Sequence, residues 1–359
     1  MQARSLVSAV PWLIALALSA APARGQLAVS TQDGSASLRL GVLAQAQGEW
    51  LEQPGDESAA QNLFLRRVRL LMGGKIGERF TFFLDTDSPN LGKAGADGKR
   101  SEPSIYLQDL VLTYQLSGQW KLDAGKLLVA NSYHSGQSAG ALLGIDYSPY
   151  GFVSSGPMGI QAGRDYGVAG RGYLFDNHLE ARIGLYQGVR GEGARNPFRT
   201  AARLVWYPFE AHTDFFYPGT TLGKKKVVAV GVSHDRQEEY RATGADLYLD
   251  LPLGRDAVTF QANLVRLDGG ALLPTLPEQV TLFVEAGYHL RARKISPFLQ
   301  FSQRDFRGSG EPDERTSQVG LAYWLDGHRL NLKAGVGTIA RDGLSDRLQV
   351  VVQGQLFLF

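Results

Sequence analysis

The sequence contains no cysteine in its 359 residues, so disulfides, thiolate catalysis and cysteine metal sites are excluded. Beyond its first residues it also lacks any uninterrupted apolar run close to the ~20 residues that a membrane-spanning helix requires, which excludes a helical membrane protein. Opposite charges nearly balance, with a formal net charge of +2. No long-range field therefore favours nucleic acid as a partner.

The N-terminus has the parts of a secretory signal peptide. One positive charge precedes an apolar segment, which ends at the A-x-A cleavage motif Ala21-Pro22-Ala23. We expect residues 1–23 to be removed, with cleavage after Gly25 as the alternative. An exported chain without disulfides needs another source of stability, and a closed β-barrel, whose backbone groups are all paired, is one answer.

Alternation with a period of two is the dominant pattern in the rest of the chain. Around residue 70, for example, Val68 and Leu70 have one parity, and Arg67 and Arg69 have the other. This pattern is typical of β-strands with one apolar and one polar face. It recurs in a hairpin within 63–87 and in strands at 37–50, 105–114, 119–129, 165–174, 178–189, 198–207, 227–234, 240–251, 257–267, 280–290, 295–306, 316–325, 330–339 and 347–359.

These segments predict an all-β protein, a transmembrane antiparallel β-barrel of about 16 strands with a wet interior. The barrel would occupy residues 37–359, behind a periplasmic leader at 26–36. Residues 131–163 are rich in Gly, Ser, Ala, Tyr and Pro and too long for an ordinary connection, so they can fold into the lumen and narrow it. A soluble exported β-sandwich would alternate in the same way and stays an alternative.

Charged residues recur on the polar parity of the predicted strands, where a dry core would make them prohibitive. They could line the pore and steer ions, or they could pair with carboxylates on neighbouring strands, including Asp246 and Glu285, as a solvated wall. The candidate pore-lining residues are Arg67, Arg69, Asp85, Asp109, Lys121, Asp123, Arg171, Arg203 and Lys333.

Two other features have open interpretations. Lys224-Lys225-Lys226 could bind lipopolysaccharide phosphates or draw anions to the channel mouth, although such runs are more often solvated rims. At the C-terminus, Phe357 and Phe359 share the parity of Gln353 and Gln355. This mixture predicts either a β-bulge in the last strand or an end at the barrel rim.

One match to a catalytic motif occurs, at residues 136–140, where Ser138 occupies the G-x-S-x-G position of hydrolases. Its surroundings are simply rich in Gly, Ser and Ala, so chance explains the match, and a barrel-based phospholipase is the alternative function. The six histidines are scattered without the spacing of a metal site. We therefore expect no enzymatic activity, no cofactor and no metal.

The segments FLRRVRLLMGGKIGERFTFFLDTD, LVLTYQLSGQWKLDAGKLLV and GLAYWLDGHRLNLKAGVG resemble the phosphate-selective porin O/P family of Gram-negative outer membranes. The resemblance implies a 16-stranded barrel in the outer membrane, in contact with lipid and lipopolysaccharide. It further implies a homotrimer through which small anions or other hydrophilic solutes diffuse passively. The best-known members carry dense basic loops in the pore, whereas residues 131–163 here contain no such loop.

Overall fold

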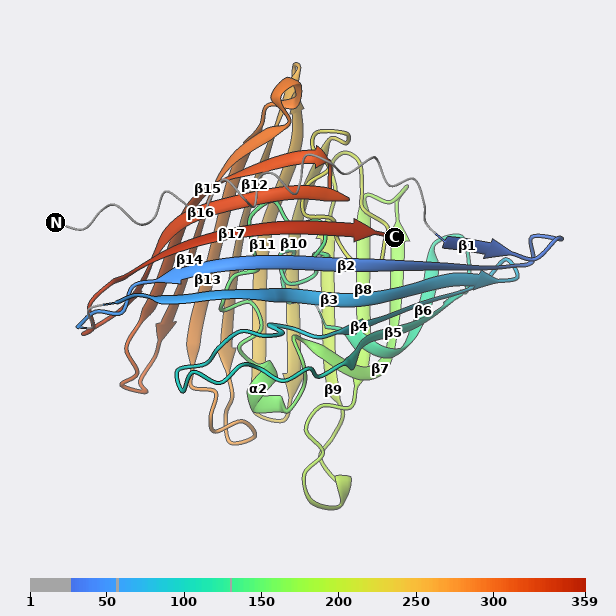
Figure 1. Ribbon diagram of the computed structural model, residues 1–359. Coiled ribbons are helices and arrows are strands. Elements are labelled where there is room, and N and C mark those ends of the chain that lie inside the picture. Colours follow the sequence, from blue (N-terminus) through green and yellow to red (C-terminus); the bar gives the residue numbers. More distant parts are fainter. Residues whose placement is uncertain (1–26, 56–57, 130) are drawn as a thin grey trace.

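A computed structural model describes residues 27–55, 58–129 and 131–359, which are almost entirely β-structure (Figure 1). The predicted signal peptide lies outside the described residues. The strands are β1 (Leu27–Ser30), β2 (Ala36–Leu51), β3 (Ala60–Ile76), β4 (Phe80–Asp87), β5 (Tyr106–Gln115), β6 (Trp120–Leu128), β7 (Arg164–Leu174), β8 (Leu179–Tyr186), β9 (Arg199–Trp206), β10 (Val227–Gln237), β11 (Tyr240–Leu253), β12 (Asp256–Asp268), β13 (Gln279–His289), β14 (Ile295–Phe306), β15 (Glu314–Asp326), β16 (Leu330–Arg341) and β17 (Arg347–Leu358). The helices are α2 (Ser155–Met158), η1 (Glu192–Ala194) and η2 (Arg291–Arg293).

Strands β2 to β17 form one closed antiparallel cylinder. Each pairs with the next along the chain, and β17 pairs with β2 from Gln349↔Leu51 to Leu358↔Val42. The predicted fold class and the count of 16 strands are confirmed, and the soluble β-sandwich is excluded. In the described part of the chain, no helix has the length and apolar character to cross a membrane.

The predicted leader at 26–36 contains a short strand that extends the barrel wall. Strand β1 pairs with the start of β2, from Leu27↔Leu40 to Ser30↔Ser37, just beyond the point where β17 ends. The first residues of β2 would otherwise have unpaired backbone groups on this side, and β1 pairs them.

The two faces of the wall differ as the alternation predicts. Leu70 and Ile183 point outward and are 60% and 64% exposed, as side chains in contact with lipid would be. The inward parity instead holds buried polar and charged residues such as Arg69 and Gln45. The apolar clusters inside the barrel form where connecting loops pack against the wall.

The two ends of the barrel differ in the length of their connections. Residues 77–79, 116–119 and 254–255 make short turns at the end that holds β1 and the C-terminus, which is the periplasmic end of such barrels. Longer connections, including 88–105 and 129–163, lie at the other end. The 20-residue connection between β9 and β10, residues 207–226, is an exception because it lies at the periplasmic end.

The C-terminal strand has neither of the predicted irregularities. Its pairing with β16 and β2 runs to Leu356 and Leu358 without a register shift. Phe357 and Phe359 keep the inward parity of Gln353 and Gln355, so they point into the barrel instead of leaving it at a bulge or the rim. Gly41 and Gly73 make room for Phe359, because a Cβ atom on either would come within 2.8 Å of its ring.

Candidate functional site: the interior of the barrel

All nine predicted pore-lining residues have their side chains on the inner face of the wall. Arg69, Asp85, Lys121 and Arg171 border cavities in the lumen. The other five are buried against the loops inside the barrel and border none of these cavities: Arg67, Asp109, Asp123, Arg203 and Lys333.

Ion pairs occupy the half of the wall from β3 to β11. Two examples are Arg171, whose Nε lies 2.9 Å from Asp123 Oδ2, and Arg203, whose Nη1 and Nη2 each lie 2.7 Å from the Asp246 carboxylate. Further pairs join Arg69 to Asp85 and Asp87, Arg164 to Asp109, Arg182 to Glu180, and Arg199 to Asp165 and Asp235. Removal of one partner from such a buried pair leaves an uncompensated charge and costs about 3–5 kcal/mol.

The two predicted lysines have other partners. Lys333 Nζ donates to the carbonyl oxygens of Leu142 and Gly144, at 2.7 Å each. Lys121 is half-buried, and its Nζ lies 5.5 Å from the centroid of the Tyr173 ring. Among the ion pairs of the described residues, neither lysine takes part.

Amide side chains occupy the rest of the wall and hold the backbone of the loop that follows β6. Gln355, Gln353 and Gln300 donate to the carbonyl oxygens of Gly140, Ile145 and Asp146, respectively. These bonds satisfy carbonyl groups that lie inside the barrel away from regular secondary structure. Residues 131–163 therefore lie within the lumen, along the inner face of the wall; below they are called the outer inward loop.

A second loop enters from the periplasmic end. Residues 207–226, called the inner inward loop, meet the outer inward loop in the middle of the barrel. The Tyr217 N–H donates to Gly136 O and the Ser138 N–H to Tyr217 O, which gives a parallel bridge between Gln137 and Tyr217. Gly219 allows this approach, because a Cβ atom there would lie 2.1 Å from Ala141 O.

A stack of tyrosines consolidates the contact between the two loops and the wall. The Tyr133 ring lies between Tyr217 and Tyr248, with centroid distances of 4.5 and 4.1 Å. All three are fully buried, and the Tyr133 hydroxyl shares a 2.6 Å hydrogen bond with Nδ1 of His212. The β9–β11 side of the lumen is therefore filled by packed aromatic side chains.

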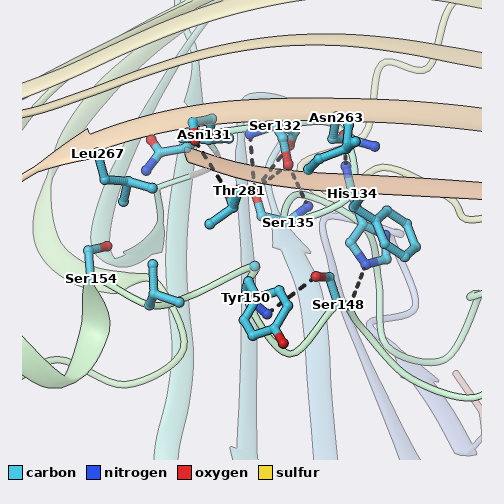
Figure 2. Close-up of a pocket in the computed structure, with 15 residues that line it drawn as sticks. Asn131, Ser132, His134, Ser135, Ser148, Tyr150, Ser154, Asn263, Leu267 and Thr281 are labelled. Carbon is cyan, nitrogen blue, oxygen red and sulfur yellow. Dashed lines mark hydrogen bonds between the residues drawn. The ribbon is translucent and has the colours of Figure 1, made fainter. Parts of the chain in front are cut away.

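Figure 2 shows the side of the outer inward loop that faces β12 and β13. His134 and Ser148 lie close together there, because the Ser148 N–H donates to His134 Nε2, and the His134 N–H donates to Asn263 on β12. The gap left at this contact is only about 30 Å³. A volume of this order suits single water molecules.

Larger spaces lie on the opposite side of the loop. A cavity of about 270 Å³ opens between residues 145–149 and β2, β3 and β14–β17 toward the outer end. Tyr147 lines its floor and donates a hydrogen bond to Gln137 O. Asp146 lies beside it and binds Arg67 Nη2 at 2.6 Å and Arg66 Nε at 2.5 Å.

Two cavities lie below this floor, toward the periplasmic end. The first, about 230 Å³, is lined by five phenylalanines and is called the phenylalanine chamber: Phe83, Phe215, Phe216, Phe357 and Phe359. The second, about 480 Å³, is called the basic vestibule. It is lined by five cationic side chains and only two carboxylates, Glu78 and Asp214; the cations are Arg39, Lys75, Arg79, Lys121 and Arg171.

Burial controls the ionisation of the polar residues in the inward loops. It lowers the pKa of His134 to about 4 and, together with nearby Lys225, the pKa of His212 to about 3. Burial alone would raise the pKa of Asp146. The guanidinium groups of Arg66 and Arg67 outweigh this effect and hold its pKa well below the usual range.

Several interior residues were not among the sequence-derived candidates. Arg199 shares its strand and parity with Arg203, which was chosen, and Arg182 lies on the polar parity of β8 with Glu180, so a stricter use of parity would have found both. Asp146 and Tyr147 had no such signal, because they lie in a loop without alternation. Nothing in the sequence indicated that residues 207–226 turn inward.

Two remaining sequence features lie away from the lipopolysaccharide site and the hydrolase nucleophile that were weighed for them. Lys224-Lys225-Lys226 belongs to the inner inward loop at the periplasmic end, and Lys226 Nζ lies 3.6 Å from the centroid of the Phe209 ring. Lipopolysaccharide lies in the outer leaflet, far from this position. Ser138 follows the loop bridge at Gln137 and is not in a strand–turn–helix elbow, the context that a hydrolase nucleophile requires.

Comparison with known proteins gives one sequence match and many structural ones. Residues 46–217 match the family described as phosphate-selective porin O and P, which confirms the resemblance noted in the strand sequences. Among curated proteins, none matches the chain.

Solved structures with the same fold cover nearly the whole chain. An anion-selective porin from Comamonas acidovorans is 11% identical with a TM-score of 0.57, over 90% of this chain and 100% of that one. OmpF of Salmonella typhi, in complex with daunomycin, is 14% identical with a TM-score of 0.57, over 91% and 100%. The trimer form of OmpT, an outer-membrane protein of Vibrio cholerae, is 11% identical with a TM-score of 0.53, over 90% and 100%.

Proposed function

Since this chain is an outer-membrane porin whose residues 46–217 match the phosphate-selective porin O and P family, we propose that small anions and other small hydrophilic solutes cross it by passive diffusion. The observation that carries the proposal is the position of the free volume inside the closed barrel. It lies on one side of the inward loops, as a cavity near the outer end and two more near the periplasmic end.

The proposed path passes the layer formed by Tyr147 and Gln137. Tyr147 lines the outer cavity, Gln137 lines the phenylalanine chamber, and the hydrogen bond between them marks the narrowest step. Arg67 and Asp146 lie beside this step and fix the loop to the wall. The position of the outer inward loop against the wall then sets the width of the narrowest section. This width determines which solutes are excluded by size, because width and charge act on selectivity most strongly where the pore is narrow.

The charge distribution supports a modest preference for anions without a phosphate-specific site. Arg67, Arg69, Arg171 and Arg203 are neutralised by carboxylates, so they do not form a ladder of free cations. The excess positive charge is in the basic vestibule, at the periplasmic end of the path. We assign the predicted pore-lining role to Arg69, Asp85, Lys121 and Arg171, and a structural role to the covered residues.

We also propose that the protein works without catalysis and as a homotrimer. Support for the first point is the loop context of Ser138, and support for the second is the trimer form of the Vibrio cholerae protein with this fold. Lipid hydrolysis by the purified protein that is lost in Ser138→Ala would contradict the first. Chemical crosslinking in detergent, with a species at three times the monomer mass, tests the second.

A planar lipid bilayer tests the transport proposal directly. The purified protein should give stepwise ion conductance, and Tyr147→Ala should raise the step size on the order of twofold, because the narrowest section sets the resistance. Tyr150→Ala is the matched control, since Tyr150 is in the same loop but lines the closed gap near β12 and β13. A protein that inserts but conducts no ions would overturn the proposal.

A further inference from the structure

The phenylalanine chamber is an unusual lining for a channel that carries hydrophilic solutes. Its rings come from three separate parts of the chain: Phe83 on β4, Phe215 and Phe216 on the inner inward loop, and Phe357 and Phe359 at the C-terminus. Leu43, Leu71 and Ala139 complete its apolar surface. A cavity of about 150 Å³ lined by such residues can already hold a benzene ring, and this one measures about 230 Å³.

The rings are arranged edge to face. The Phe83 ring is inclined at 71° to Phe216 and at 74° to Phe359, with centroid distances of 5.5 Å to each. Phe215 is inclined at 84° to Phe216, at 4.9 Å. Such an arrangement presents both ring faces and ring edges to an occupant, and an aromatic guest finds favourable contacts with both. An aliphatic guest of the same size would gain only from burial.

Cations flank the same rings on the side of the basic vestibule. The Arg39 guanidinium carbon lies 5.1 Å from the centroid of Phe359, and that of Arg171 lies 5.5 Å from the centroid of Phe215. Phe83, Phe215 and Phe359 line both cavities, so the two spaces adjoin. Arg39 and Lys121 have no carboxylate within ion-pair distance among the described residues, whereas Arg171 is paired with Asp123.

The wall of the chamber also contains polar groups with unused hydrogen-bonding capacity. Arg69 and Asp85 line it, and both are more than nine-tenths buried. Within the described structure, Arg69 Nε and Asp85 Oδ1 have no hydrogen-bond partner. Both atoms are enclosed by the wall and have almost no accessible surface, so the chamber presents its phenylalanine rings, and not these two groups, to a guest.

We propose that the phenylalanine chamber and the basic vestibule together form a binding site for aromatic monocarboxylates, with the ring in the chamber and the carboxylate beside Arg39 and Lys121. The proposal rests on the proposed function, because it assigns a preferred solute class to the same path. An aromatic cation is disfavoured by the excess of positive charge in the vestibule. An aliphatic carboxylate would use the cations but not the phenylalanines.

Block of single-channel current tests the site, with sodium benzoate as the probe and cyclohexanecarboxylate and acetate as comparisons. Benzoate added on the periplasmic side should reduce the current at a lower concentration than either comparison. Phe216→Ala and Lys121→Gln should each raise the half-blocking benzoate concentration at least about fivefold, since a ring contact and a charge are lost. Phe216→Ala should also abolish the advantage of benzoate over cyclohexanecarboxylate.

Two matched controls should leave the block unchanged. Phe209→Ala removes a ring from the same inner inward loop outside the chamber, and Lys294→Gln removes an exposed cation at the same end of the barrel. Equal block by benzoate and cyclohexanecarboxylate in a conducting wild-type channel would overturn the inference while leaving the porin proposal intact. Equal effects of Phe209→Ala and Phe216→Ala would overturn it as well. A channel that does not conduct at all would instead contradict the porin proposal.

Discussion

Arg67 on β3 and Asp146 on the outer inward loop form a partly buried ion pair between the wall and the loop, with 2.6 Å between Arg67 Nη2 and Asp146 Oδ1. Arg67 also donates to Gln45 Oε1 at 2.8 Å, which fixes the guanidinium against the wall. This pair therefore determines how closely the loop lies against the strands beside the proposed path. Arg66 contacts the other carboxylate oxygen from a more exposed position.

Arg67→Gln should loosen the outer inward loop rather than change ion selectivity. The loop attachment should lose on the order of 2 kcal/mol, because a charged hydrogen bond is removed while Asp146 stays paired with Arg66. We expect larger current fluctuations in single-channel records and an unchanged reversal potential in asymmetric salt. Arg266→Gln, which breaks an exposed pair with Glu278, is the control and should change neither. A shifted reversal potential in Arg67→Gln would show that Arg67 acts as a filter.

Lys121→Gln and Arg39→Gln should reduce the preference for anions. Both residues line the basic vestibule without a carboxylate partner among the described residues, so each replacement removes uncompensated positive charge from the path. The chloride-over-potassium permeability ratio, obtained from the reversal potential, should fall in each variant and fall further in the double variant. The change should shrink at high salt, where screening is stronger. A ratio equal to that of the wild type would exclude the vestibule as the source of selectivity.

Acidification should release the inward loops. The pKa of His134 is about 4 in the packed loop and about 6.5 in a released one, so the released state binds more protons as the pH falls below 6.5. At pH 5 this difference disfavours the packed state by about 2 kcal/mol, and His212, with a pKa of about 3, acts in the same direction. Asp146 does not contribute above pH 4, because its pKa is held well below that value.

Single-channel fluctuations and chymotrypsin cleavage within residues 131–163, compared at pH 7.5 and pH 5, measure this release. The segment contains tyrosine and phenylalanine but no lysine or arginine, and cleavage is normalised to an unfolded substrate at each pH. Both should increase at pH 5 and increase less in His134→Gln. His234→Gln serves as the control, because His234 is exposed on the outer face of β10. Identical records at the two pH values in the wild type would contradict the predicted dependence.

Gly219→Ala should separate the two inward loops. The added Cβ atom would lie 2.1 Å from Ala141 O, a backbone atom, so the loops must move apart at a cost of about 1–3 kcal/mol. Conductance should rise as the packed layer opens, and trypsin should cut residues 207–226 more rapidly from the periplasmic side. Gly118→Ala lies in a turn at the same end with no heavy atom within 4 Å of its Cβ position, and it should behave as the wild type.

The wall of the barrel could be predicted from the sequence because parity is a local property. Arg69, Lys121 and Arg203 face inward for the same reason that Leu70 and Ile183 face lipid, and this follows from counting residues along a strand. Even the closing strand obeys this rule, although Phe357 and Phe359 were expected to leave the pattern. The inward position of Phe359 depends on Gly41 and Gly73, which lie on other strands, and that of Phe357 depends on Gly140 in the outer inward loop.

The contents of the lumen could not be predicted in this way, because they depend on contacts between distant segments. Asp146 meets Arg67 across 79 positions of sequence, and Gly140 meets Gln355 across 215. The partners of Arg203 and Lys333 illustrate the limit. For Arg203, a carboxylate on a nearby strand was expected, and Asp246 two strands away is the partner. Lys333 instead binds carbonyl groups of a loop, which alternation along the strands does not predict.

The bridge between Gln137 and Tyr217 links a segment that enters from outside the cell to one that enters from the periplasm. Neither segment can be exchanged alone, because the backbone groups of each are satisfied by the other at mid-depth. Replacing the outer inward loop to change which solutes enter would therefore also disturb the inner inward loop at the periplasmic end of the path. The two loops must be redesigned as one unit.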